Sequence, residues 1–197
     1  MDNDKKDQID FFNKKAEKWD EHVTDKSIEV AKKVIKKYKI GKNNSVLDVG
    51  AGTGILYSIL KKENLSDYLG LDISPKMIEV FSEKHPDADI KRIDFENNVD
   101  LDRKFDFVII FDTIPHLDKI DMVFKNAHKN LKIGGQFLII HSKTRKELKK
   151  HHNEIGHEQE DPIPTDEVLK LMTWTYGFED IDIKDDEYFL FAAKKKR

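Results

Sequence analysis

The chain has 197 residues, no cysteine and a formal net charge of −3 at pH 7, and 37% of its residues are charged. This length suits one domain with a real core, and the lack of cysteine excludes disulfides and thiolate catalysis. Interspersed charges of both signs argue against a nucleic-acid surface. No apolar run reaches the ~20 residues that span a bilayer, and the charged N-terminus lacks a secretory segment, so we expect a cytoplasmic protein.

Apolar residues recur at helical spacing within the first 26 residues. They are Ile9, Phe11, Phe12, Ala16, Trp19 and Val23. The pattern predicts an added helical segment, which either packs on the domain or covers a site. A further helix is expected from Ser27 to about Tyr38.

An apolar strand then runs into an acid and three alternating glycines, at residues 46–54 (Val-Leu-Asp-Val-Gly-Ala-Gly-Thr-Gly). Glycine lets a ligand lie against bare backbone and adopts positive φ readily. The amides at the start of the next helix, Gly54 to about Glu63, are expected to face that ligand. The turn therefore predicts a site for a nucleoside-containing cofactor.

Two classes of protein compete at this turn. The dinucleotide-binding turn of NAD-dependent oxidoreductases follows G-x-G-x-x-G and holds a pyrophosphate. Here Asp48 precedes the glycines and the last gap is one residue shorter. A carboxylate in the turn suits an ammonium group or an ordered water better than a pyrophosphate. Asp48-x-Gly50-x-Gly52-x-Gly54 resembles the first motif of class I S-adenosylmethionine-dependent methyltransferases, D/E-x-G-x-G-x-G, at every defined position.

The next predicted elements extend this resemblance. A strand at residues 68–71 ends at Asp72, whose carboxylate can accept hydrogen bonds from both ribose hydroxyls. Ser74 and Pro75 begin a helix as N-cap and first helical residue. The resemblance implies that Asp94 and Phe95, after a short third strand, face the adenine. The expected cofactor set is Asp48, Gly50, Ala51, Gly52, Gly54, Asp72, Ile73, Asp94, Phe95 and Phe111.

The fourth strand, Phe105–Phe111, is almost wholly apolar, as expected for a central parallel strand. The loop after it lies where open α/β sheets bind ligands, and it offers Asp112 and His116 as catalytic residues. It lacks the Asn-Pro-Pro-aromatic motif that many amine-directed methyltransferases carry. This departure argues against an enzyme that modifies nucleic-acid bases.

A turn at Gly134-Gly135 is expected before a fifth strand, residues 137–140, that ends at His141. Alternating strands at residues 179–184 and 188–193 predict a terminal antiparallel hairpin. The predicted fold class is α/β: a Rossmann-like class I methyltransferase fold over residues 1–197, with a mostly parallel seven-stranded sheet, a C-terminal antiparallel hairpin and helices on both faces.

Residues 141–164 are expected to form an insertion on the substrate side. It holds His141, His151, His152 and His157. Ser142 is expected to cap a helix through Leu148 that would carry His151 and His152 toward His116 and His141. One interpretation makes His116 or His141 a general base. The other places a divalent transition metal on His116, His141 and His152. Arg145 is the predicted anchor for an anionic substrate.

The N-terminal pattern F-F-x-x-x-A-x-x-W-D resembles the leader of small-molecule methyltransferases. The resemblance implies that residues 1–26 form a lid, with Phe12 and Trp19 over the cofactor, which excludes water from the transfer site. Plain packing of an added helix is the alternative.

The sequence thus predicts an S-adenosylmethionine-dependent methyltransferase that acts on a small molecule, by in-line transfer at the carboxyl ends of the fourth and fifth strands. A monomer or homodimer is expected, without nucleic-acid or membrane partners. The alternatives are an NAD-binding oxidoreductase, an S-adenosylmethionine-binding protein without transfer activity, and a protein or nucleic-acid methyltransferase. The acceptor and its reacting atom stay open.

Overall fold

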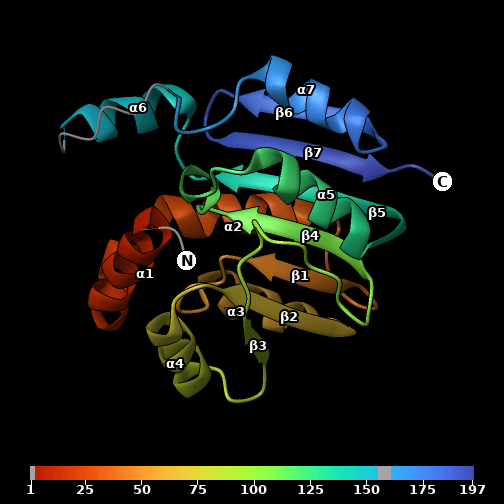
Figure 1. Cartoon of the computed structure of the whole chain (residues 1–197). Helices are drawn as coiled ribbons and strands as arrows, with labels where there is room; N and C mark the ends of the chain where they lie inside the picture. The colour runs from red at the N-terminus through yellow and green to blue at the C-terminus, as the bar shows by residue number, and fades with distance from the viewer. Residues whose placement is uncertain (1–2, 155–160) are drawn as a thin grey trace. The chain divides into compact units, whose positions relative to one another are not determined.

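The structure, a computed structural model, describes residues 3–154 and 161–197, apart from the side chains of His152 and Glu154. The chain forms two compact units, Met1–Asp94 and Phe95–Arg197. Figure 1 labels their helices and strands. The single domain expected over residues 1–197 stays a prediction, and His157 lies outside the described residues.

The first unit begins with α1 (Asn3–Lys15), the 3-10 helix η1 (Ala16–His22) and α2 (Asp25–Lys37). The backbone N–H of Ser27 donates to the Thr24 hydroxyl, which caps α2. The buried face of α2 carries residues at helical spacing: Val30, Ala31, Val34 and Ile35.

Three strands of the first unit, β1 (Ser45–Val49), β2 (Asp67–Asp72) and β3 (Asp89–Arg92), pair in parallel in the order β3-β2-β1. The helices α3 (Ile55–Leu60) and η2 (Lys61–Glu63) follow β1, and α4 (Pro75–Lys84) follows β2. The predicted cap of α4 is confirmed, since Met77 N donates to the Ser74 hydroxyl at 3.1 Å.

The second unit contains β4 (Phe105–Phe111), β5 (Leu131–His141), β6 (Phe178–Asp185) and β7 (Phe189–Lys195). Their order is β4-β5-β7-β6, with a parallel β4–β5 pair and antiparallel β5–β7 and β7–β6 pairs (Figure 1). The helices of this unit are η3 (Ile114–His116), α5 (Ile120–Asn130), α6 (Arg145–Glu154) and α7 (Asp166–Thr175).

The fold class predicted from the sequence is confirmed. Seven strands form a mostly parallel sheet that ends in an antiparallel C-terminal hairpin and is accompanied by helices. Nearly every residue of β1 and β4 is buried, as expected for parallel strands. Within residues 3–154 and 161–197, no helix has the length and apolarity to span a membrane.

The predicted glycine turn before the fifth strand is wrong. Gly134 and Gly135 lie inside β5, where the pairing with β4 jumps from Phe105↔Leu131 to Phe107↔Gln136. Gly134 has a φ of 77°. A Cβ on Gly135 would lie 3.0 Å from the Asp106 carbonyl oxygen. The two glycines therefore form a bulge with close backbone approach, not a loop.

The helix expected to begin after Ser142 begins at Arg145 instead. Thr144 N donates to the Glu147 carboxylate at 2.8 Å, and Glu147 N donates to the Thr144 hydroxyl at 3.2 Å. This reciprocal capping box satisfies two backbone donors and fixes the start of the helix.

Two asparagines of α5 hold the segment that precedes β4. Asn126 is fully buried; its side chain accepts from Val99 N and donates to the carbonyls of Phe95 and Asn97. Asn130 repeats this arrangement one turn later with Leu101 N and Val99 O. The side-chain amides of Asn126 and Asn130 therefore form the hydrogen bonds that a helix or strand would otherwise give the backbone of this segment.

Asn126→Ala is expected to lower the free energy of unfolding by about 2 kcal/mol, because it leaves buried backbone groups without partners. Urea unfolding of the two proteins measures this difference. The exposed Asn98→Ala is the matched control and should change stability by less than about 0.5 kcal/mol. Equal losses in both variants would contradict the structural role of Asn126.

Candidate functional site

The glycine turn, residues 50–54, joins β1 to α3. Gly50, Gly52 and Gly54 have φ values of 74°, 55° and 93°. These values lie in the left-handed region, which side chains with a Cβ disfavour. The alternating glycines of the sequence motif thus correspond to a backbone path that requires them.

Four amides of the turn donate within the protein. Gly50 N and Ala51 N donate to the Leu71 carbonyl, Gly54 N to the Ala51 carbonyl, and Gly52 N to Asp72 Oδ2 at 2.8 Å. The expectation that the amides at the start of α3 face a ligand stays a prediction, whereas these four amides of the turn already have acceptors within the protein. Because its glycines have no side chains, the turn lets a ligand approach its Cα atoms closely. A pyrophosphate needs free N–H groups, so this arrangement does not suit one.

Asp72 links the glycine turn to the turn after β2. Its Oδ2 accepts from Gly52 N, and its Oδ1 accepts from Ser74 N at 2.8 Å. Burial raises the pKa of Asp72, while the bonds from the backbone amides of Ser74 and Gly52 act in the opposite direction. A carboxylate has further acceptor capacity, which suits it to the hydroxyl groups of a ribose.

Asp48 lies beneath the turn and is enclosed. Its side chain is 1% exposed and accepts a 2.8 Å hydrogen bond from the Tyr68 hydroxyl. Burial raises the pKa of Asp48 to about 7; the bond from Tyr68 lowers it and the nearby charge of Asp72 raises it. Tyr68 was not among the predicted site residues, and the contact of Asp48 with an ammonium group or water stays a prediction.

Hydrogen bonds attach the N-terminal segment to the glycine turn and to the turn after β2. The Thr53 hydroxyl donates to Asp20 Oδ1 at 2.6 Å, and Asp20 also forms an ion pair with Lys84. The Ser74 hydroxyl donates to Asn13 Oδ1 at 2.8 Å. These anchors place the segment against the residues predicted to bind the cofactor.

The predicted aromatic pair belongs to the same segment. A Cβ on Gly52 would lie 3.7 Å from Trp19 Nε1, so the indole faces the glycine turn. The Trp19 and Phe12 rings lie 5.5 Å apart, edge to face. The polar anchors Asn13 and Asp20 were not among the predicted site residues, although Asp20 ends the W-D pair of the motif.

The remaining predicted cofactor residues occupy several positions. Ala51 is buried in the glycine turn, and the Ile73 carbonyl accepts from Arg92 Nε at 3.2 Å. Asp94 ends the first unit. Phe95 and Phe111 belong to the second unit and are 2% and 5% exposed. Their contacts with adenine stay predictions.

In the second unit the structure brings together two predicted catalytic residues, Asp112 and His141, at the adjacent ends of β4 and β5. Asp112 has a φ of 52°, a strained value for a residue with a side chain. Its Oδ1 accepts from Ser142 N at 2.6 Å and lies 3.6 Å from His141 Nδ1. The carboxylate thus fixes the turn after β5 and faces the imidazole.

His141 is 7% exposed, and its Nδ1 accepts a 3.0 Å hydrogen bond from Lys143 N. A neutral ring whose Nδ1 accepts carries its proton on Nε2. Proton removal at Nε2 therefore requires the other tautomer, in which Nδ1–H points to Asp112. His116 lies in η3, four residues after Asp112.

Arg145 is already engaged by the protein. Its Nε and Nη2 donate to the Pro164 carbonyl, and Nη1 lies 3.0 Å from Asp166 and 3.3 Å from Asp185. The guanidinium also lies 4.5 Å from the Phe189 ring centroid. Most of its donors thus join α6 to α7 and the hairpin, and its role as a substrate anchor stays a prediction.

The predicted metal site finds no support. No group of three metal-ligating side chains occurs among the residues that the structure describes, which include His116 and His141. The side chain of His152, the third predicted ligand, lies outside them.

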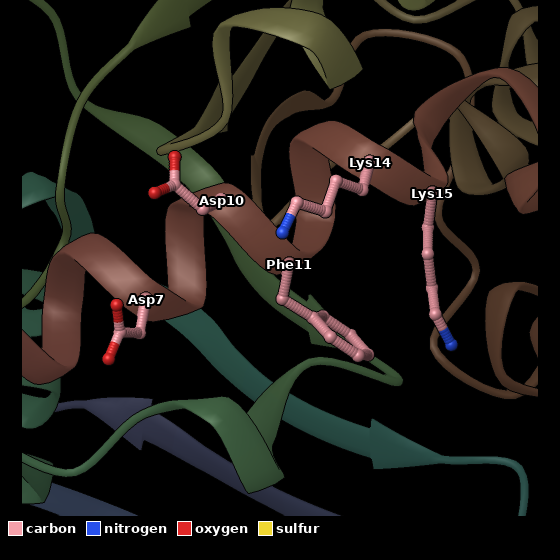
Figure 2. A pocket seen from close by; sticks show the side chains of 5 residues that line it. All are labelled: Asp7, Asp10, Phe11, Lys14 and Lys15. Carbon is pink, nitrogen blue, oxygen red and sulfur yellow. The ribbon is translucent and has the colours of Figure 1, made fainter.

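A hollow of about 350 Å³ runs along α1 (Figure 2), lined by Asp7, Asp10, Phe11, Lys14 and Lys15. These residues share one helix face, and Lys15 Nζ lies 4.5 Å from the centroid of the Phe11 ring. None of the predicted cofactor residues lines this hollow.

Comparisons with known proteins agree with this geometry. A family model described as a methyltransferase domain matches residues 47–137. The ubiquinone biosynthesis O-methyltransferase of Pelagibacter ubique is 29% identical over 72% of this chain and 67% of its own length. The demethylmenaquinone methyltransferase of Listeria welshimeri is 31% identical over 55% of this chain and 49% of its own length. The chain thus spans about half to two thirds of these curated relatives.

A solved structure extends the likeness in fold to nearly the whole chain. It is a chain of the complex between the Haloferax volcanii Trm112 methyltransferase activator and a methyltransferase, with a TM-score of 0.78 and 17% identity over 94% of this chain and 98% of that one. The sheet order and these matches agree: the chain has the Rossmann-like fold of class I methyltransferases, and its residues 47–137 match a methyltransferase domain.

Proposed function

We propose that this protein transfers the methyl group of S-adenosylmethionine to a small-molecule acceptor. The single observation that carries the cofactor assignment is the Asp72 carboxylate, which bridges Gly52 N and Ser74 N beside a turn whose glycines all have positive φ. This arrangement fits the cofactor, because bare Cα atoms allow close approach and Asp72 can bind the ribose hydroxyls.

When bound, S-adenosylmethionine supplies a methyl group that its sulfonium already activates. The protein has to align the acceptor with the methyl–sulfur bond and exclude water. In our proposal Asp94 and Phe95 bind the adenine, and Trp19 and Phe12 cover the cofactor. Asp48, enclosed against Tyr68, braces the turn from below.

Where the acceptor loses a proton, we propose His141 as the general base and Asp112 as the group that orients it. The Asp112 carboxylate lies 3.6 Å from Nδ1 and would stabilise the tautomer in which Nε2 accepts the proton. His116 is the alternative base. We propose no metal for this step.

The acceptor class is proposed from the relatives, two of which are named for ubiquinone biosynthesis and for demethylmenaquinone. Hydroxylated benzene and naphthalene rings are therefore the first acceptors to test. The protein is expected to act as a monomer or homodimer, which light scattering after size exclusion measures.

Calorimetry with S-adenosylmethionine and with NAD tests the cofactor. Binding of the first and not of the second supports the proposal; the reverse result would replace it with the oxidoreductase alternative. Formation of S-adenosylhomocysteine with a hydroxylated-ring acceptor then separates an enzyme from a binding protein without transfer activity.

The N-terminal segment is proposed as the cover of the cofactor. Removing both anchors with Asn13→Ala and Asp20→Ala is expected to weaken S-adenosylmethionine binding by up to about 30-fold, because each substitution removes a side-chain hydrogen bond worth ~1 kcal/mol. Residues 3–22 should also become more sensitive to limited proteolysis. Asp7→Ala with Asp10→Ala, on the exposed face of α1, is the matched control. Unchanged affinity in the anchor variant would favour plain packing.

A further inference from the structure

His85 lies directly behind the glycine turn. It follows the last residue of α4, is 4% exposed, and packs edge to face on Tyr57 and Phe81. A Cβ on Gly54 would lie 2.7 Å from its Nε2. The imidazole thus fills the space that any side chain at position 54 would need.

Hydrogen bonds connect this ring to the first turn of α3. The Ser58 hydroxyl donates to the Gly54 carbonyl at 2.8 Å and lies 3.2 Å from His85 Nε2. Because the single hydroxyl proton goes to the carbonyl, Ser58 accepts from Nε2–H. The relay His85–Ser58–Gly54 therefore fixes both the tautomer of the ring and the carbonyl of the last turn glycine.

The other ring nitrogen, Nδ1, faces no hydrogen-bond acceptor among the described residues. This atom is buried and has no hydrogen-bond partner there. Protonation would place an N–H there without an acceptor, and such a buried donor is costly. The neutral ring therefore leaves no buried N–H without an acceptor, whereas the protonated ring would leave one at Nδ1.

The charged groups around His85 come from several elements. Lys61 in η2 and Lys84 in α4 lower its pKa together with burial, the largest cause; Asp87 after α4 and Asp20 in η1 raise it. The Tyr57 hydroxyl donates to Asp87 at 3.1 Å, and Asp20 accepts from Thr53. Both carboxylates are thus partly occupied by other partners, and the net effect is a lowered pKa.

We propose that His85 is a positioning residue for the cofactor: the neutral imidazole, wedged against Gly54 and bonded to Ser58, holds the glycine turn in its binding conformation, and protonation of the ring loosens the turn and weakens S-adenosylmethionine binding. This inference rests on the proposed function, because it takes the glycine turn to be the cofactor site.

Calorimetry of the full chain with S-adenosylmethionine at pH 7.5 and pH 5.5 tests the proposal. The dissociation constant of the wild type is expected to rise severalfold at the lower pH but by less than about tenfold, because linkage allows a tenfold rise only for a ring whose pKa in the free protein is 6.5 or higher, and the pKa of His85 is lowered from 6.5. His85→Gln keeps an N–H for Ser58 but does not titrate, so its dissociation constant should change clearly less than that of the wild type. His128→Gln, in the second unit, is the matched control and should follow the wild type.

Measurements on the wild type keep the test valid even where His85→Gln fails to fold. By reciprocity, a ligand that binds the neutral form better must lower the pKa of His85, which NMR titration of the histidine ring signals with and without S-adenosylmethionine measures. A His85 pKa that the ligand does not change would overturn the proposal, as would a His85→Gln variant with the pH profile of the wild type. Lack of any S-adenosylmethionine binding at pH 7.5 would instead overturn the proposed function, and the inference with it.

Discussion

Asp72→Ala is expected to weaken S-adenosylmethionine binding by about 100-fold or more. The substitution removes the proposed acceptor for two ribose hydroxyls, and hydrogen bonds to a charged group contribute about 1.5–3 kcal/mol each. It also releases Gly52 N and Ser74 N, which both donate to this carboxylate. Calorimetric titration of the two proteins at neutral pH measures the loss.

Asp67→Asn, at the opposite end of β2, is the control and should bind the cofactor like the wild type. Thermal unfolding of both variants separates lost contacts from a lost fold. A dissociation constant for Asp72→Ala within threefold of the wild type, in a folded protein, would contradict the proposed ribose site.

The contribution of Asp48 to stability is expected to fall as the pH rises from about 4 to about 7, and the difference in unfolding free energy between the wild type and Asp48→Asn isolates it. The pKa of Asp48 is raised from 3.8 to about 7 in the folded protein, so between these values the folded state holds a proton that the unfolded chain has released. Stability then decreases with pH, by up to about 4 kcal/mol in total. Urea unfolding at several pH values measures this slope.

Asp48→Asn should remove the part of the slope that Asp48 causes, because an amide does not titrate, and should make the protein more stable than the wild type at pH 8; Asp72, whose pKa is also raised, keeps its own smaller part. Tyr68→Phe should extend the pH range over which stability falls to higher pH, since the Tyr68 hydroxyl lowers the pKa of Asp48. Glu29→Gln, on the exposed side of α2, is the control and should keep the slope of the wild type. The same slope in Asp48→Asn would show that another group causes it.

Patterns that depend on neighbours in sequence were predictable. The buried strand Phe105–Phe111 and the Ser74 cap were correct because burial on both faces and helix capping leave local signatures. The positive φ values at Gly50, Gly52 and Gly54 follow from the same kind of reasoning.

Features that depend on distant partners were not predictable. His85 fills the space beside Gly54 from 31 positions away, and the Tyr68 hydroxyl reaches Asp48 across two paired strands. No spacing rule connects such residues, because tertiary packing alone brings them together. The start of α6 differs, because the Thr144–Glu147 capping box that fixes it is a local pattern visible in the sequence and outweighs the hydroxyl of Ser142 as a cap.

The division of the chain between Asp94 and Phe95 has an evolutionary consequence. Apart from Phe95 and Phe111, every residue proposed to hold the cofactor precedes this boundary, whereas Asp112, His116, His141 and Arg145 follow it. If the proposed roles hold, changes in the C-terminal half can alter the acceptor while most contacts to the cofactor are kept. A graft between two relatives, joined at this boundary, should keep the cofactor affinity of one parent and acquire the acceptor preference of the other.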